Sequence, residues 1–157
     1  MGIEIERKFI VDSRKAPRSN ERLQIKQGYL NSNPKRCVRI RIAGDRAYLT
    51  VKGPSTGTTR AEYEYSIPRK DAEEMLKLCE TPPIEKTRHL VHYGGQIWEV
   101  DFFEGANEGL IIAEIELDHE DQSFDLPDWV DSEVSGDHRF ANSSLSNTPF
   151  NTWKSST

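Results

Sequence analysis

Apolar and charged residues alternate along most of the chain. Residues 3–9 read IEIERKF, which places Glu4, Glu6 and Lys8 at every second position. Because successive side chains of a β-strand point to opposite faces, this pattern predicts a strand with one charged face. Comparable stretches separated by turn residues predict about eight strands in all, at residues 3–11, 23–30, 36–42, 46–53, 60–68, 84–93, 96–105 and 110–120.

Helical spacing replaces the alternation in a few places. Residues 71–80 carry apolar side chains three or four positions apart and acidic residues in the first turn, so they are expected to form a helix. Residues 128–134 and 138–146 are interpreted as two further short helices. Residues 147–157 are polar and contain a proline, and we expect them to form a loose C-terminal tail.

Composition narrows the class of protein. The 157 residues suit one domain, and the net charge of −5 argues against a general nucleic-acid binder held by phosphate contacts. The two cysteines, Cys37 and Cys79, belong to no C-x-x-C or Cys/His pattern, which argues against a disulfide scaffold or a zinc finger. No apolar run has the length of a membrane helix, and the N-terminus does not read as a signal peptide. A soluble, cytoplasmic protein is expected.

The charged positions are grouped by sign, in pairs two residues apart. The acidic pairs are Glu4/Glu6, Glu62/Glu64, Glu99/Asp101 and Glu114/Glu116, and the basic pairs are Arg39/Arg41 and Lys86/Arg88, with Lys8 and Lys52 as further cations. A water-facing antiparallel sheet is one interpretation, although such a face ordinarily mixes Thr, Ser, Gln and Lys. Like charges this close repel. Divalent cations could offset the repulsion among the carboxylates, and a polyanion could offset the repulsion among the Arg and Lys side chains. A barrel enclosing both sets would bind a metal–phosphate complex.

The charged motifs also occur in a characteristic order. The opening E-x-E-x-K is followed by RIRI, TVKG, EYEY, KTR, EIEL and a closing GDHRFANSSLS. Together they resemble the CYTH superfamily, also called triphosphate tunnel metalloenzymes, over residues 3–146. The resemblance implies an α+β fold in which an eight-stranded antiparallel β-barrel forms a tunnel with a charged lumen and helices pack outside. It also implies a single domain at residues 1–146.

The resemblance assigns roles to individual residues. The metal ligands for Mg²⁺ or Mn²⁺ would be Glu4, Glu6, Glu114 and Glu116, assisted by Glu62 and Glu64. The triphosphate would be held by Lys8, Arg39, Arg41, Lys52, Lys86 and Arg88. Tyr29 and Lys52 are candidates for a catalytic pair, in which Lys52, crowded by other cations, would act as a base. Glu99 and Asp101 could either bind metal or pair with the lumen arginines.

The leading hypothesis is an inorganic triphosphatase that hydrolyses tripolyphosphate to pyrophosphate and phosphate. The protein would bind a small-molecule triphosphate, and it is not expected to bind nucleic acid or a membrane. A thiamine or nucleoside triphosphatase, a class IV adenylate cyclase and a non-catalytic polyphosphate-binding module remain alternatives. The sequence leaves the oligomeric state open, a homodimer included.

Overall fold

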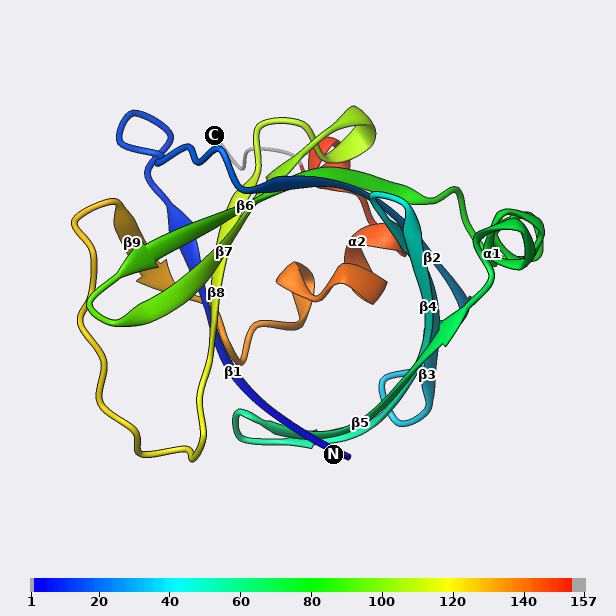
Figure 1. Ribbon diagram of the computed structural model, residues 1–157, viewed down its shortest axis with the longest axis horizontal. Helices are drawn as coiled ribbons and strands as arrows, with labels where there is room; N and C mark the ends of the chain where they lie inside the picture. The colour runs from blue at the N-terminus through cyan, green and yellow to red at the C-terminus, as the bar shows by residue number, and fades with distance from the viewer. Residues whose placement is uncertain (1, 154–157) are drawn as a thin grey trace.

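The chain folds into a closed antiparallel β-barrel (Figure 1). The computed structural model describes residues 2–153. The strands run in the order β5-β4-β3-β2-β6-β7-β8-β1, and pairing of β1 with β5 closes the ring. The ring strands are β1 (Ile3–Val11), β2 (Arg22–Asn31), β3 (Cys37–Ala43), β4 (Arg46–Thr56), β5 (Thr59–Ile67), β6 (Ile84–Tyr93), β7 (Gln96–Phe103) and β8 (Ile111–Glu116). The alternation predicted about eight strands and the resemblance implied an eight-stranded antiparallel barrel, and both are confirmed.

The barrel turns most of its paired charged side chains inward, around the lumen. Apolar clusters lie on both sides of the wall: Ile40 and Ile42 belong to one cluster, and Ile84, Phe103 and Ile112, which share strand faces with the charged residues, belong to another. Across β2 to β5, Tyr29 lies opposite Arg39, Arg39 opposite Thr50, and Thr50 opposite Glu64. Since paired residues share a face, these four side chains form one row across the lumen wall. The charged face therefore lines the interior of a barrel, and the alternative of a water-facing sheet is wrong.

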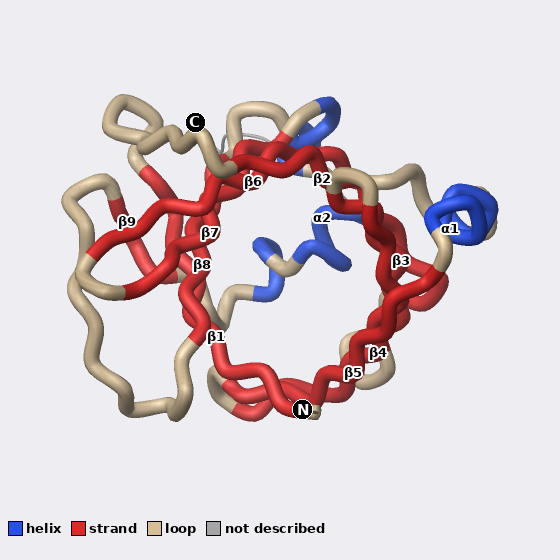
Figure 2. The backbone as a smooth tube through the Cα atoms, viewed as in Figure 1, coloured by secondary structure: helices blue, strands red, loops and turns tan. Residues whose placement is uncertain are grey.

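Helix α1 (Arg69–Leu76) covers part of the outer surface (Figure 2). It begins two residues before the predicted start, directly after Pro68, and ends four residues before the predicted end. Its Ala72 and Leu76 pack against Ile40 and Ile42 of the barrel wall. This is the external helix packing that the resemblance implied.

The predicted helix at residues 128–134 is wrong. Strand β9 (Val130–Glu133) forms there instead and pairs with β1, with Phe9 opposite Glu133. Strand β5 covers β1 only at its first residues, so the rest of that edge is free for β9, whose Glu133 also pairs with Arg7 at 2.5 Å. Pairing between distant segments has overridden a weak local preference.

The C-terminal segment enters the barrel. A 3₁₀ turn, η2 (His138–Phe140), and helix α2 (Asn142–Asn147) confirm helical structure at the residues predicted. In Figure 1 these two elements cross the interior of the ring, whereas α1 lies outside it. Helix α2 lies at the end of the barrel where β2 meets β3. A hydrogen bond from Asn147 to Ser32, in the connection between these strands, marks this position. The antiparallel order places the β3–β4 and β6–β7 turns at the opposite end.

Several residues of the expected loose tail make contacts. A second 3₁₀ turn, η3 (Phe150–Thr152), follows α2. The centroid of the Trp153 ring lies 5.1 Å from the ring centroid of Phe140 and 5.2 Å from that of Phe150. Residues 154–157 lie outside the described part of the chain. A third 3₁₀ turn, η1 (Gly105–Asn107), connects β7 to β8. Within residues 2–153, no helix is long and apolar enough to cross a membrane.

Candidate active site

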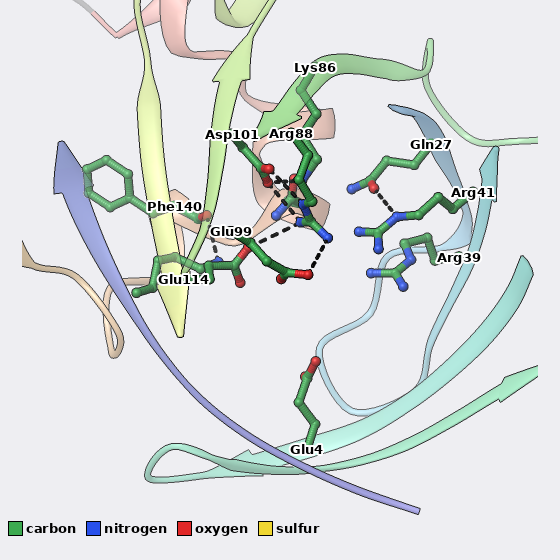
Figure 3. Close-up of polar contacts among 12 residues, drawn as sticks. Glu4, Gln27, Arg39, Arg41, Lys86, Arg88, Glu99, Asp101, Glu114 and Phe140 are labelled. Atoms are coloured by element: carbon green, nitrogen blue, oxygen red, sulfur yellow. Dashed lines mark hydrogen bonds and ion pairs between the residues drawn. The ribbon is translucent and has the colours of Figure 1, made fainter. Parts of the chain in front are cut away.

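A cavity of about 190 Å³ lies in the lumen, and every ring strand contributes to its wall. Eleven of its lining residues, and Tyr29 with them, were predicted as site residues; the full set is Glu4, Glu6, Lys8, Tyr29, Cys37, Arg39, Arg41, Lys52, Arg60, Glu62, Glu64, Arg88, Glu99, Glu114, Glu116 and residues 141–143. Figure 3 shows the contrast within this ring, where Arg39 and Arg41 lie across from Glu99 and Glu114. The cavity therefore has a basic side and an acidic side.

The two arginines of β3 have donors to spare. Arg39 is buried, and its Nη2 donates to Thr50 Oγ1 at 3.2 Å and lies 3.3 Å from Glu64 Oε2, while its buried Nε has no partner. Arg41 Nε donates to Gln27 Oε1 at 2.8 Å, and Arg41 forms no ion pair with any residue from 2 to 153. Burial in the barrel lowers the pKa of Arg41 to about 10, and repulsion from Arg39 and Arg88 makes a smaller contribution in the same direction. Such a pair is short of negative charge, so an anion in the cavity would stabilise it.

Arg88 on β6, in contrast, is paired with carboxylates. Its Nε and Nη2 donate to the two carboxylate oxygens of Asp101 at 2.8 and 2.9 Å, and Glu99 lies 3.2 Å away. Burial alone would lower the pKa of Arg88, but Asp101 and Glu99 raise it well above its usual range. Burial would likewise raise the pKa of Asp101, yet Arg88 and Lys86 lower it to about 2. Asp101 is therefore a structural partner of the basic residues, while Glu99 lines the cavity.

Lys86 lies behind the cavity wall. It is the one predicted phosphate-binding residue that does not line the cavity, and its side chain is fully buried. Its Nζ lies 2.7 Å from Asp101 Oδ2 and donates to Asn142 Oδ1 at 3.1 Å. Burial lowers the pKa of Lys86 to about 7 despite the attraction of Asp101. Helix α2 covers this position and uses the ammonium group that the resemblance assigned to the phosphate.

The acidic side is formed by β1 and β8. Glu6 lies opposite Glu116 and Lys8 opposite Glu114 in the strand register. Loss of hydration raises the pKa of Glu6, and repulsion from Glu114 and Glu4 raises it further. The pKa of Glu116 is raised by burial and by the same kind of repulsion. A cation among these carboxylates would remove the repulsion.

The two residues of the predicted catalytic pair, Tyr29 and Lys52, both line the cavity but do not contact each other through a hydrogen bond. Tyr29 is buried, and its hydroxyl accepts a hydrogen bond from Gln27 Nε2 at 3.2 Å. Lys52 Nζ lies 3.1 Å from Glu4 and 3.3 Å from Glu62. No hydrogen bond connects Tyr29 to Lys52 in the part of the chain described by the structure. The immediate neighbours of Lys52 are thus carboxylates, where cations were expected.

The family model of the CYTH domain matches residues 2–147. The chain belongs to the CYTH domain family. A protein of Acetivibrio thermocellus named inorganic triphosphatase is 48% identical over 98% of this chain and 99% of its own length. A Nitrosomonas europaea protein of the same name is 34% identical over 90% of this chain and 95% of its own. The crystal structure of an inorganic triphosphatase superposes with a TM-score of 0.66 at 33% identity, covering 91% of this chain and 93% of the other.

CYTH triphosphatases are typically metal-dependent, so the fit of a metal can be tested on the acidic side. The donors there are carboxylate oxygens, which hard cations such as Mg²⁺ and Mn²⁺ prefer. Burial raises the pKa of Glu6, and repulsion from Glu114 and Glu4 raises it further, so a cation at this position would stabilise the ionised carboxylate. Within residues 2–153, no three acidic, His or Cys groups already converge as a formed metal site. The donor chemistry fits a divalent cation, and the side chains would have to close around it.

Among the polar residues that the sequence interpretation missed, Arg60 and Asn142 line this CYTH cavity, while Gln27 and Thr50 contact the lining residues Arg41 and Arg39. Gln27, Thr50 and Arg60 each lie two residues before a predicted site residue and therefore share its face. The period of two could have identified them. Asn142 carries no comparable signal, because a helix that crosses the lumen cannot be recognised from strand alternation.

Proposed function

We propose that this chain is an inorganic triphosphatase, which hydrolyses tripolyphosphate to pyrophosphate and phosphate with Mg²⁺ or Mn²⁺. The relative at 48% identity over nearly the whole chain bears this name. The observation that carries the proposal is the charge arrangement of the cavity. On one side, Arg39 has a single 3.3 Å contact with Glu64 and a buried Nε without a partner, and Arg41 forms no ion pair within residues 2–153. Mutually repelling carboxylates lie on the other side.

The basic side would bind the phosphate chain. Arginine presents its donors in a planar fork that suits phosphate oxygens, and Arg39 and Arg41 retain such donors. Arg88 is held rigidly by Asp101, so it offers the phosphate a fixed positive charge. Lys8 and Lys52 line the cavity as well. Lys86 would act indirectly, by keeping Asp101 and α2 in place.

The acidic side would hold the metal. Glu4, Glu6, Glu114 and Glu116 would supply the oxygen ligands, with Glu62 and Glu64 nearby on β5. A bound divalent cation neutralises phosphate charge and makes the phosphorus easier to attack. A purely binding module for polyphosphate would gain little from this many carboxylates. The catalytic function is therefore favoured over the binding module.

The reaction would be attack of water on a terminal phosphorus. A bond forms between the water oxygen and phosphorus, the bridging P–O bond breaks, and its electron pair leaves with pyrophosphate. We assign Tyr29 and Lys52 to the orientation of the water, and Glu62 to the acceptance of its proton. Glu62 contacts Lys52 at 3.3 Å, and burial together with repulsion from Glu4 raises its pKa. A carboxylate with a raised pKa is a better base near neutral pH.

The cavity wall favours an inorganic substrate. Of the described residues that line it, Tyr29 alone is aromatic, and its ring packs in the core beside Phe140 and Leu145. Recognition of adenine or of a thiazole ring ordinarily uses apolar or aromatic contacts. The same reasoning disfavours an adenylate cyclase, which must bind adenine.

A substrate panel tests the function. Phosphate release would be measured from tripolyphosphate, ATP, thiamine triphosphate and pyrophosphate with Mg²⁺ or Mn²⁺. We expect the highest turnover on tripolyphosphate and none after addition of EDTA. Glu116→Gln should lose metal-dependent activity, while Glu73→Gln, a matched change on the exposed face of α1, should keep it. Formation of cyclic AMP from ATP, or full activity of Glu116→Gln, would contradict the proposal.

A further inference from the structure

The floor of the cavity is made by the start of α2. Residues 141–143 line the same cavity as the β3 arginines. Two lumen lysines hold this segment: Lys8 Nζ donates to the carbonyl oxygen of Phe140 at 3.2 Å, and Lys86 Nζ donates to Asn142 Oδ1 at 3.1 Å. Figure 3 shows Lys86 beside Arg88 and Asp101, and Phe140 nearer to Glu114. The floor is thus fixed to the charged wall.

The contact with Lys86 determines which way the Asn142 amide faces. Lys86 Nζ donates to Asn142 Oδ1, so the carbonyl side of the amide faces Lys86. The amide nitrogen then points elsewhere, and among residues 2–153 no group accepts a hydrogen bond from Asn142 Nδ2. Asn142 is half-buried and faces the cavity. A free donor therefore remains at the bottom of an anion-binding space.

We propose that Asn142 is a substrate-binding residue, whose Nδ2 donates a hydrogen bond to the phosphoryl oxygen that lies deepest in the barrel. This inference rests on the proposed function for the identity of the substrate, and adds to it the contact at the floor. The donor is neutral, so it binds an oxyanion without adding to the repulsion among Arg39, Arg41 and Arg88. Lys86 is the positioning residue that orients it.

An isosteric substitution tests the donor. Asn142→Asp keeps oxygen acceptors for Lys86 and replaces the NH₂ group by a negatively charged oxygen. We expect the Kd for tripolyphosphate, measured by calorimetry in EDTA so that no turnover occurs, to rise about tenfold or more. The Tm without ligand should stay the same or rise, because Lys86 gains a charged partner. The increase in Tm caused by tripolyphosphate should shrink accordingly.

Asn147→Asp is the matched control. It introduces the same charge at the other, exposed end of α2, where Asn147 donates to Ser32. This variant should bind tripolyphosphate as the wild type does. Wild-type affinity in Asn142→Asp, or an equal loss in both variants, would overturn the inference.

Two further outcomes are distinguishable. If Asn142→Asp fails to fold, Asn142→Ala removes the donor without adding charge, and it should weaken tripolyphosphate binding severalfold; unchanged binding in that variant would overturn the inference. If the wild type binds tripolyphosphate but does not hydrolyse it, and Asn142→Asp binds it more weakly, the proposed activity fails while the floor contact stands.

Discussion

The basic pairs on β3 and β6 have the same spacing but opposite surroundings. Arg39 and Arg41 of β3 face the cavity with donors unused, whereas Lys86 and Arg88 of β6 share the buried carboxylate of Asp101. The difference comes from the neighbouring strand: β7 supplies Asp101 opposite Arg88, while β4 supplies Thr50 opposite Arg39. Asp101 therefore ties the β6 pair into the framework, whereas the β3 pair keeps more of its donors for a ligand.

The largest expected effect is on the framework pair. Asp101→Asn would leave two buried cations with an uncharged partner, and breaking a buried ion network typically costs about 3–5 kcal/mol of unfolding free energy. Urea denaturation monitored by circular dichroism measures this. Glu99→Gln is the control, because Glu99 is only partly buried, and it should cost far less. Equal stability of the Asp101→Asn variant and the wild type would remove the distinction between the two pairs.

A smaller effect, of a different kind, is expected on β3. Arg41→Gln removes a cation that lacks a carboxylate partner, so the free energy of unfolding should stay unchanged or increase. The kcat/KM for tripolyphosphate should fall about 100-fold, because a charged contact to the phosphate is lost. Steady-state kinetics and urea denaturation on one preparation test both parts. Loss of stability together with activity would show that Arg41 is structural after all.

The third expected effect concerns the pH dependence of stability. The folded pKa of Lys86 is about 7, below its ordinary value of 10.5, so between these values the unfolded state binds more protons. Stability should therefore increase with pH across this window, by at most about 1.4 kcal/mol for each pH unit from Lys86. The groups around it are Asp101, Arg88, Arg41 and Glu114. Lys86→Met should flatten the pH dependence of unfolding free energy from pH 7 to 10. An unchanged slope would assign the effect to other groups.

The ring of lumen residues could be predicted because strand alternation is a local property. Glu4, Arg39 and Glu114 all face inward as the period of two requires. The choice between Glu99 and Asp101 could not be predicted, because it depends on the register that places Asp101 opposite Arg88. Strand β9 was missed for a similar reason, since its four residues form a strand only through pairing with β1.

The position of α2 was also beyond the sequence. Its residues predict a helix, but nothing in them distinguishes packing outside the barrel from crossing the lumen. The decisive contacts are made by lysines on β1 and β6, far away in the chain. The resemblance gave those lysines to the phosphate, and for Lys86 the helix has taken that place.

Helix α2 has a consequence for the length of phosphate chain that the cavity can hold. Residues 141–143 line the same cavity of about 190 Å³ as the charged strands, so the helix occupies part of the lumen. The reach of a linear phosphate chain is therefore limited by this helix as well as by the strands.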